Sequence, residues 1–178
     1  MENVSLSTKD LVRVSIFTAL IAIGAYIAIP IGPVPITLQS FFVLVSAVFL
    51  GRKAIYSTIV YIVLGIIGLP VFSGGVSGIS KVFTPSFGFL IGMIVCSYVL
   101  GYIFEKYRDL SFSKVLAVFL LGSFILYLIG MPYMAAILNI YLDKGLSFNQ
   151  ILTSGMLLFL PGDILKSILA AMIYKRIK

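Results

Sequence analysis

Long apolar runs, separated by short segments of proline, glycine and basic residues, dominate the sequence. A helix needs about 20 mostly apolar residues to cross about 30 Å of hydrocarbon, because it rises about 1.5 Å per residue. Six stretches reach or approach this length, and they run from Leu11 to Ile29, Thr37 to Leu50, Ala54 to Leu69, Pro85 to Phe104, Lys114 to Leu142 and Phe148 to Tyr174. The pattern predicts an all-α integral membrane protein of six transmembrane helices, forming one domain over residues 1–178.

The connections after the first and third spans contain the residues that interrupt helices. Pro30, Gly32, Pro33 and Pro35 lie in the first of these connections, and Pro70, Gly74, Gly75 and Gly78 lie in the second. The spans between them must be helical, because backbone N–H and C=O groups find no water partners in lipid. The second and third spans are short, which indicates an irregular or sheltered segment beside them.

Composition supports membrane insertion and argues against a soluble domain. Hydrophobic residues make up 61% of the chain and charged residues 11%, with a mean hydropathy of +1.17. A soluble domain has about 45–50% apolar and about 25% charged residues. The net charge of +7 could suggest a nucleic-acid partner, but the basic residues form short clusters that flank apolar runs. Such clusters are typical of membrane interfaces, so we expect no nucleic acid.

The distribution of basic residues predicts the orientation. Short loops rich in Lys and Arg stay in the cytoplasm. With six spans, one side would hold both termini and ten basic residues, namely Lys9, Arg13, Arg52, Lys53, Lys106, Arg108, Lys114, Lys175, Arg176 and Lys178. The other side would hold only Lys81 and Lys144. We therefore expect a multi-pass protein of a bacterial or archaeal cell membrane, with cytoplasmic termini and outward-facing Pro/Gly-rich loops.

Asp163 and Lys166 are charged residues inside the last span. A charge at the bilayer centre costs at least about 2.5–3.5 kcal/mol, so it usually faces the bundle interior, forms a pair or marks a substrate path. The i, i+3 spacing places both side chains on one helix face. Pro161 and Gly162 would open the helix just before the pair or start a new segment there, with Asp163 in its positive first turn. The pair is either a structural salt bridge or, as we favour, a site for a small ligand with N–H donors and a carbonyl or carboxylate.

Other polar residues could contribute to such a site from the two loops. The glycine-rich segment 69–78 allows backbone to approach a ligand closely, although it could also be a plain connection. If it closes as a lid, Ser77, Ser80 and Lys81 are its polar contributors, and Gly75 is a further candidate contact. Gln39 lies about one turn into the second span, where an amide can bind substrate or simply join two helices.

Small residues form a stripe along the first span. Ser15, Thr18, Ala19, Ala22 and Ala25 recur at helical spacing, and small residues let another helix approach closely. The stripe could pack within the bundle or against another protein.

Missing residue types exclude several activities. The chain has no histidine, which removes the commonest general base, and it has no G-x-x-x-x-G-K-[ST] nucleotide loop. We therefore expect no enzyme activity, no catalytic residues, no metal and no cofactor. Energy for uphill transport would have to come from an ion gradient or from a partner.

Four motifs together resemble the BioY family, the biotin-specific substrate-capture (S) components of energy-coupling-factor (ECF) transporters. They are Pro33-Val34-Pro35-Ile36-Thr37-Leu38-Gln39, Gly68-Leu69-Pro70-Val71-Phe72 followed by Gly74-Gly75, Pro85-Ser86 with Gly88, and Pro161-Gly162-Asp163-Ile164-Leu165-Lys166. The resemblance implies a six-helix S component that binds biotin from outside and docks on a transmembrane coupling protein with two ATPase subunits. It implies that Asp163 and Lys166 hold the polar groups of biotin and that both loops close over it.

The resemblance also implies a role for the first span. Ser15, Ala19 and Ala22 correspond to the coupling face of the family, with Ser15 in place of one alanine. The glycine run of the family is interrupted here as Gly75-Val76-Ser77-Gly78, so an altered lid could accept another small vitamin. A stand-alone proton-coupled carrier and a membrane scaffold are the remaining alternatives.

Overall fold

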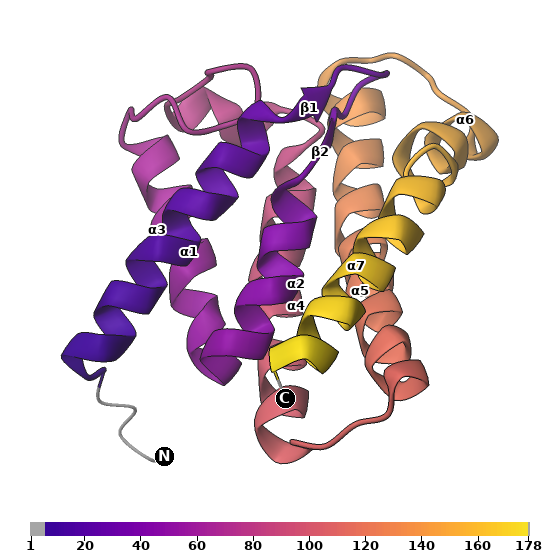
Figure 1. The fold of residues 1–178 in the computed structure, drawn as a ribbon. Helices are drawn as coiled ribbons and strands as arrows, with labels where there is room; N and C mark the ends of the chain where they lie inside the picture. The colour runs from indigo at the N-terminus through magenta and orange to yellow at the C-terminus, as the bar shows by residue number, and fades with distance from the viewer. Residues whose placement is uncertain (1–5, 178) are drawn as a thin grey trace.

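Six helices of 12 or more residues run back and forth between two ends of the molecule in the computed structural model, which describes residues 6–177 (Figure 1). They are α1 (Thr8–Tyr26), α2 (Gln39–Leu50), α3 (Ala54–Ile66), α4 (Phe87–Lys106), α5 (Phe112–Ala136) and α7 (Leu160–Ile177). The start of α1 and the end of α7 lie at the same end of the bundle, the terminal end. The two Pro/Gly-rich loops lie at the opposite, distal end. The chain is mostly helical, as the apolar runs predict.

Four helical runs of the described chain are long and apolar enough to cross a membrane: Gln39–Ile66, Phe87–Lys106, Phe112–Tyr141 and Phe148–Ile177. The first of them contains the short 3-10 helix η1 (Gly51–Lys53), where the chain reverses direction (Figure 1). Gln39 at the start of α2 therefore contacts Tyr61 near the end of α3. Helices α2 and α3 have 12 and 13 residues, or about 18–20 Å each, which confirms that these two segments are short.

The loops at the distal end contain short strands and a 3-10 helix, which their proline and glycine residues do not predict. Strands β1 (Ala28–Ile29) and β2 (Ile36–Thr37) pair antiparallel, with Ala28 opposite Thr37. Residues 28–29 were expected to end the first helix. The 3-10 helix η2 (Ile79–Phe83) follows the glycine-rich loop. These elements satisfy backbone groups where the chain leaves the helices.

The last apolar run is divided, although its hydropathy predicts one continuous span. Helix α5 continues as the π-helix η3 (Ile137–Tyr141), and α6 (Phe148–Leu152) is followed by the π-helix η4 (Thr153–Leu157). Helix α7 then begins at Leu160, which places Asp163 in its first turn. Two outcomes were expected at Pro161 and Gly162, an opened helix or a new helical segment, and the structure has the second, with the new segment beginning at Leu160.

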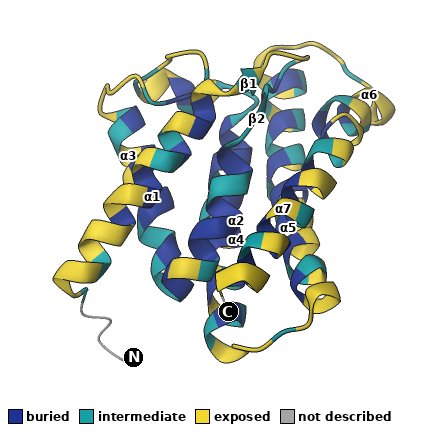
Figure 2. Ribbon diagram, viewed as in Figure 1, coloured by how far each residue is buried: buried dark blue, intermediate teal, exposed yellow. Residues whose placement is uncertain are grey.

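The helices turn one side toward a buried core and another toward the outside (Figure 2). The core contains Tyr61, Phe119, Leu100 and Tyr174, all nearly inaccessible. Large hydrophobic side chains such as Leu128 on α5 are exposed on the outer faces. A soluble protein of this size rarely exposes so much contiguous apolar surface, so this surface is suited to lipid contact.

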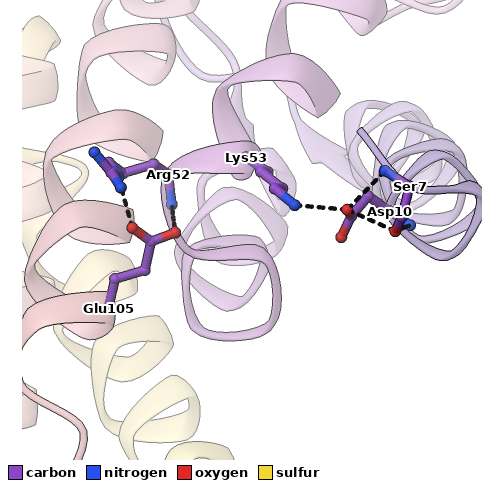
Figure 3. Close-up of polar contacts among 5 residues, drawn as sticks. All are labelled: Ser7, Asp10, Arg52, Lys53 and Glu105. Carbon is purple, nitrogen blue, oxygen red and sulfur yellow. Dashed lines mark hydrogen bonds and ion pairs between the residues drawn. The ribbon is translucent and has the colours of Figure 1, made fainter. Parts of the chain in front are cut away.

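Two ion pairs fix the turn between α2 and α3 at the terminal end (Figure 3). Arg52 Nε lies 2.6 Å from Glu105 Oε2 on α4, and Lys53 Nζ lies 2.6 Å from Asp10 Oδ2 on α1. Hydrogen bonds from Lys53 and Ser7 lower the pKa of the Asp10 carboxyl to about 2. Asp10 is therefore ionised at neutral pH, and its pair with Lys53 joins the start of α1 to the turn.

Candidate substrate-binding site

A cavity near the distal end is lined by residues from both loops and from five helices, α2, α3, α4, α5 and α7. The space beside its lining, together with the open solvent at its mouth, is about 620 Å³. Its apolar lining consists of Val34, Pro35, Phe72, Phe89, Leu90, Met93, Leu126 and Phe159. Its polar lining consists of Thr37, Gln39, Ser40, Tyr61, Ser73, Lys81, Ser86, Tyr127, Asp163 and Lys166. Such a cavity can hold an amphipathic molecule.

Asp163 and Lys166 form a buried pair in this cavity. Lys166 Nζ lies 2.9 Å from Asp163 Oδ1 and also donates to Ser40 Oγ at 3.0 Å. The Tyr127 hydroxyl donates to Asp163 Oδ2. The i, i+3 contact confirms the expected common face, whereas Tyr127 and Ser40 were not predicted. An ammonium has three donors, so one N–H of Lys166 remains for a ligand acceptor.

Gln39 joins three parts of the cavity wall. Its amide Nε2 donates to the Tyr61 hydroxyl at 2.7 Å, and its Oε1 accepts from Thr37 Oγ1 at 3.0 Å. The Tyr61 hydroxyl in turn donates to the backbone carbonyl of Val71 at 3.2 Å. These bonds connect the first turn of α2 to α3 and to the glycine-rich loop. Gln39 therefore lies in the cavity wall and joins two helices, so its two sequence-based interpretations are compatible.

Lys81 is a buried cation in the wall of the cavity. It is 8% exposed, and its Nζ lies 5.8 Å from the centre of the Phe72 ring. Within residues 6–177 its ammonium makes no ion pair and no hydrogen bond to protein. Burial lowers the pKa of the Lys81 ammonium. A buried cation without a carboxylate partner is suited to an anionic ligand group.

The glycine-rich loop inserts Phe72 as a wall of the site. Phe72 is 1% exposed, packs edge-on against Tyr61 at 5.6 Å and faces Gly65, where a Cβ atom would overlap its ring. A backbone bond from Phe72 N to Val76 O at 3.2 Å closes the turn through Gly74 and Gly75. Both glycines have positive φ angles, of 80° and 71°, which favour glycine. The tip of the loop, at Gly74 and Gly75, is exposed and does not line the cavity.

The remaining candidate residues lie outside the cavity. Gly75 is exposed at the turn and Ser77 is half-buried, and neither lines the cavity, so their contact with substrate stays a prediction. On α1, Ser15 and Ala19 are exposed and Ala22 is half-buried. Thr18 and Ala25 of the same stripe are buried against the bundle instead, with Thr18 Oγ1 donating to the Ser57 carbonyl at 3.1 Å. The stripe is therefore divided between an inner and an outer face.

Metal chemistry has no support in the part of the chain that the structure describes. Within residues 6–177, no group of three His, Cys, Asp or Glu side chains could hold a metal ion. The polar groups of the cavity are hydrogen-bond donors, acceptors and charges, which can bind and orient a ligand.

Comparison with known proteins decides the family. The model of the BioY family matches residues 1–178. The chain belongs to the BioY family. Among BioY proteins, "Biotin transporter BioY" of Thermotoga maritima is 39% identical over 96% of this chain and 96% of the relative. "Probable biotin transporter BioY" of Lysinibacillus sphaericus is 35% identical over 96% of this chain and 87% of the relative.

A solved structure shares the BioY fold seen here. The crystal structure of the S-component for biotin from an ECF-type ABC transporter superposes with a TM-score of 0.84. The two chains are 28% identical, and the match covers 97% of this chain and 94% of that one. The fold is therefore that of an ECF S component, as the four motifs imply.

Proposed function

We propose that this BioY protein captures biotin from outside the cell and delivers it as the substrate-binding subunit of an ECF-type ABC transporter. The arrangement of charges in the cavity supports this most directly. The cavity wall contains the Asp163–Lys166 pair, the separate cation Lys81, and aromatic and aliphatic side chains. Biotin likewise has a polar ureido ring, an apolar body and a carboxylate.

The hydrogen-bonding capacity of the site suggests how biotin is oriented. Asp163 can accept from the ureido N–H groups, since each carboxylate oxygen can accept more than one bond. Lys166 uses two of its three donors on Asp163 and Ser40, so the third can reach the ureido carbonyl. Lys81 has no protein acceptor for its ammonium within the described residues. The carboxylate of biotin therefore pairs with Lys81.

The proposed function requires the cavity to face outward. The two ion pairs to the α2–α3 turn and the other basic clusters lie at the terminal end, which suits the cytoplasmic surface. The chain then crosses the membrane six times, with both termini in the cytoplasm. The distal loops face the exterior, and inward movement of the glycine-rich loop would bring Gly75 and Ser77 to the ligand.

Delivery requires a docking surface for the transmembrane coupling protein and its two ATPase subunits. Ser15, Ala19 and Ala22 suit this role, because they form a strip of small side chains on the outer face of α1. The described chain has no nucleotide-binding loop, so ATP hydrolysis belongs to the partners.

Replacing Ala19 with Trp tests whether the strip on α1 serves docking to the coupling protein and not biotin binding. A bulky side chain on the docking strip prevents close helix approach, so we expect at least a tenfold loss of labelled-biotin uptake in cells that express the chain with an ECF coupling module. Biotin binding by the purified variant should stay unchanged. The matched control is Leu128→Trp, an exposed position on α5. Equal uptake by both variants would show that the strip is not the docking surface, and uptake of riboflavin instead of biotin would refute the proposed substrate.

A further inference from the structure

Lys81 is the cavity cation whose ammonium has no protein acceptor among the described residues. It lies on η2, a 3-10 helix of five residues that begins after Gly78. So short a helix is marginal by itself, and a lysine carries its ammonium on a flexible stem. The contacts that hold the η2 backbone therefore decide where the ammonium can reach.

Tyr133 of α5 supplies one of these contacts. Its hydroxyl donates to the backbone carbonyl of Val82, the residue that follows Lys81, across 51 positions of the chain. Neither Tyr133 nor Val82 lines the substrate cavity. The bond therefore acts on η2 from outside the site.

The ring of Tyr133 is held in turn by the first turn of α4. A Cβ atom on Gly88 would lie 2.3 Å from Tyr133 Cβ, so glycine at this position allows α5 to approach α4 closely. The ring of Phe87, in the same turn, is centred 6.2 Å from that of Tyr133. Tyr133 thus packs on the start of α4 while its hydroxyl reaches η2, and it bridges the corner between these two elements.

A second contact ties the end of η2 to the same helical run. Phe83 stacks on Tyr141 of η3, with ring centres 5.5 Å apart and planes inclined by 28°. Helix η3 is the direct continuation of α5. Two consecutive residues of η2, Val82 and Phe83, are therefore held by the run that contains α5 and η3.

Lys81 directs its side chain from this held backbone into the cavity wall. Its carbonyl accepts from Thr84 Oγ1 at 2.7 Å, and its Nζ lies 5.8 Å from the centre of the Phe72 ring. These contacts leave the donors of the ammonium for a ligand. An ionic contact with a bound ligand depends on the ammonium being placed at the right point before binding, and here the backbone of η2 sets that point.

We propose that Tyr133 is a positioning residue for substrate recognition, whose bond to Val82 holds η2 so that the Lys81 ammonium meets the carboxylate of biotin. This role rests on the proposed pairing of Lys81 with that carboxylate. Tyr133 does not itself contact the ligand. The Asp163–Lys166 pair has other partners, so loss of the Tyr133 hydroxyl affects only the carboxylate end of the site.

Calorimetry of the purified full chain with biotin and with biotin methyl ester tests this role. Tyr133→Phe removes the hydroxyl and keeps the ring, so we expect a loss of affinity for biotin of roughly 3- to 10-fold. The affinity for the methyl ester, which lacks the anionic group, should change little. In the Lys81→Gln background, Tyr133→Phe should cause no further loss. The matched control, Tyr26→Phe, removes a hydroxyl that donates to the Pro70 carbonyl at the other end of the loop, and it should leave the ratio of the two affinities unchanged.

Several results would overturn the proposal. Equal losses for biotin and its ester in Tyr133→Phe would show a general structural role, and no loss for either would show that η2 does not need this bond. A further loss in the Lys81→Gln background would show that Tyr133 acts independently of Lys81. Thermal unfolding reports on the fold, and Phe83→Leu, which removes the stack on Tyr141, takes the place of Tyr133→Phe if that variant does not fold.

The same data separate this role from the proposed pairing. If Lys81→Gln itself lowers both affinities equally, the pairing of Lys81 with the carboxylate is wrong, and the role of Tyr133 is wrong with it. If Lys81→Gln lowers the affinity for biotin selectively and Tyr133→Phe does not, only the role of Tyr133 is wrong.

Discussion

Replacing Asp163 with Asn is expected to weaken biotin binding roughly 30-fold to several-thousand-fold. The carboxylate accepts from Lys166 Nζ at 2.9 Å and from the Tyr127 hydroxyl, and both partners are buried in the cavity wall. In the complex, Asp163 is proposed to accept from the ureido N–H groups of biotin, and truncating one partner of such buried, charged hydrogen bonds costs about 2–5 kcal/mol of binding free energy. At about 1.4 kcal/mol per factor of ten, this energy gives the stated range. Calorimetry with purified variants measures it.

Two further variants separate binding from folding at Asp163. Asp143→Asn removes an exposed carboxylate from a distal loop and should leave the affinity unchanged. The double variant Asp163→Asn/Lys166→Met removes both charges, so its Tm should recover relative to Asp163→Asn while binding stays lost. Unchanged affinity for biotin in both Asp163→Asn and Lys166→Met would show that the pair has a structural role only.

Replacing Lys81 with Gln is expected to lower the affinity for biotin roughly 10- to 150-fold. A hydrogen bond to a charged group contributes about 1.5–3 kcal/mol, and the ammonium of Lys81 is buried without a protein carboxylate partner among the described residues. The loss should be much smaller for biotin methyl ester, which lacks the anionic group. A variant that loses affinity for both ligands equally would contradict the pairing of Lys81 with the carboxylate. Lys144→Gln, at an exposed distal position, is the matched control.

The same pairing predicts a pH dependence. Burial lowers the pKa of Lys81 below the ordinary value of 10.5, whereas a bound carboxylate favours the protonated form. Above the lowered pKa, Lys81 of the free protein is neutral, so binding of the biotin carboxylate must be accompanied by uptake of a proton. The affinity for biotin therefore falls as the pH rises through this pKa. This alkaline decline should begin below pH 10.5 and disappear in Lys81→Gln.

The sequence predicts those parts of the site that depend on local spacing. Asp163 and Lys166 are three residues apart, so their contact follows from helix geometry alone. Tyr127 and Ser40 lie 36 and 126 positions from their partners, and no periodicity indicates which distant helices meet. The sequence offers one indication of these distant partners: Tyr127 carries a hydroxyl within a mainly apolar run of the fifth span.

The fold is predictable to a similar extent. Apolar length identifies the helices, because lipid requires long apolar runs, and the shorter runs at residues 37–50 and 54–69 indicate the shorter helices α2 and α3. Hydropathy does not reveal the break before α7, since residues on both sides of it are equally apolar. Glycine content also predicts flexibility of the chain at Gly74 and Gly75 without showing that Phe72 is buried and the loop tip exposed.

Calorimetry of the purified wild-type chain tests the central claim most directly. Biotin, desthiobiotin and riboflavin would be titrated in turn, without a coupling module or ATP. The account predicts that one biotin binds per chain and that desthiobiotin, which keeps the ureido ring and the carboxylate, binds and competes. Riboflavin should give no binding heat. Absence of biotin binding by a folded chain, or equal binding of riboflavin, would contradict it.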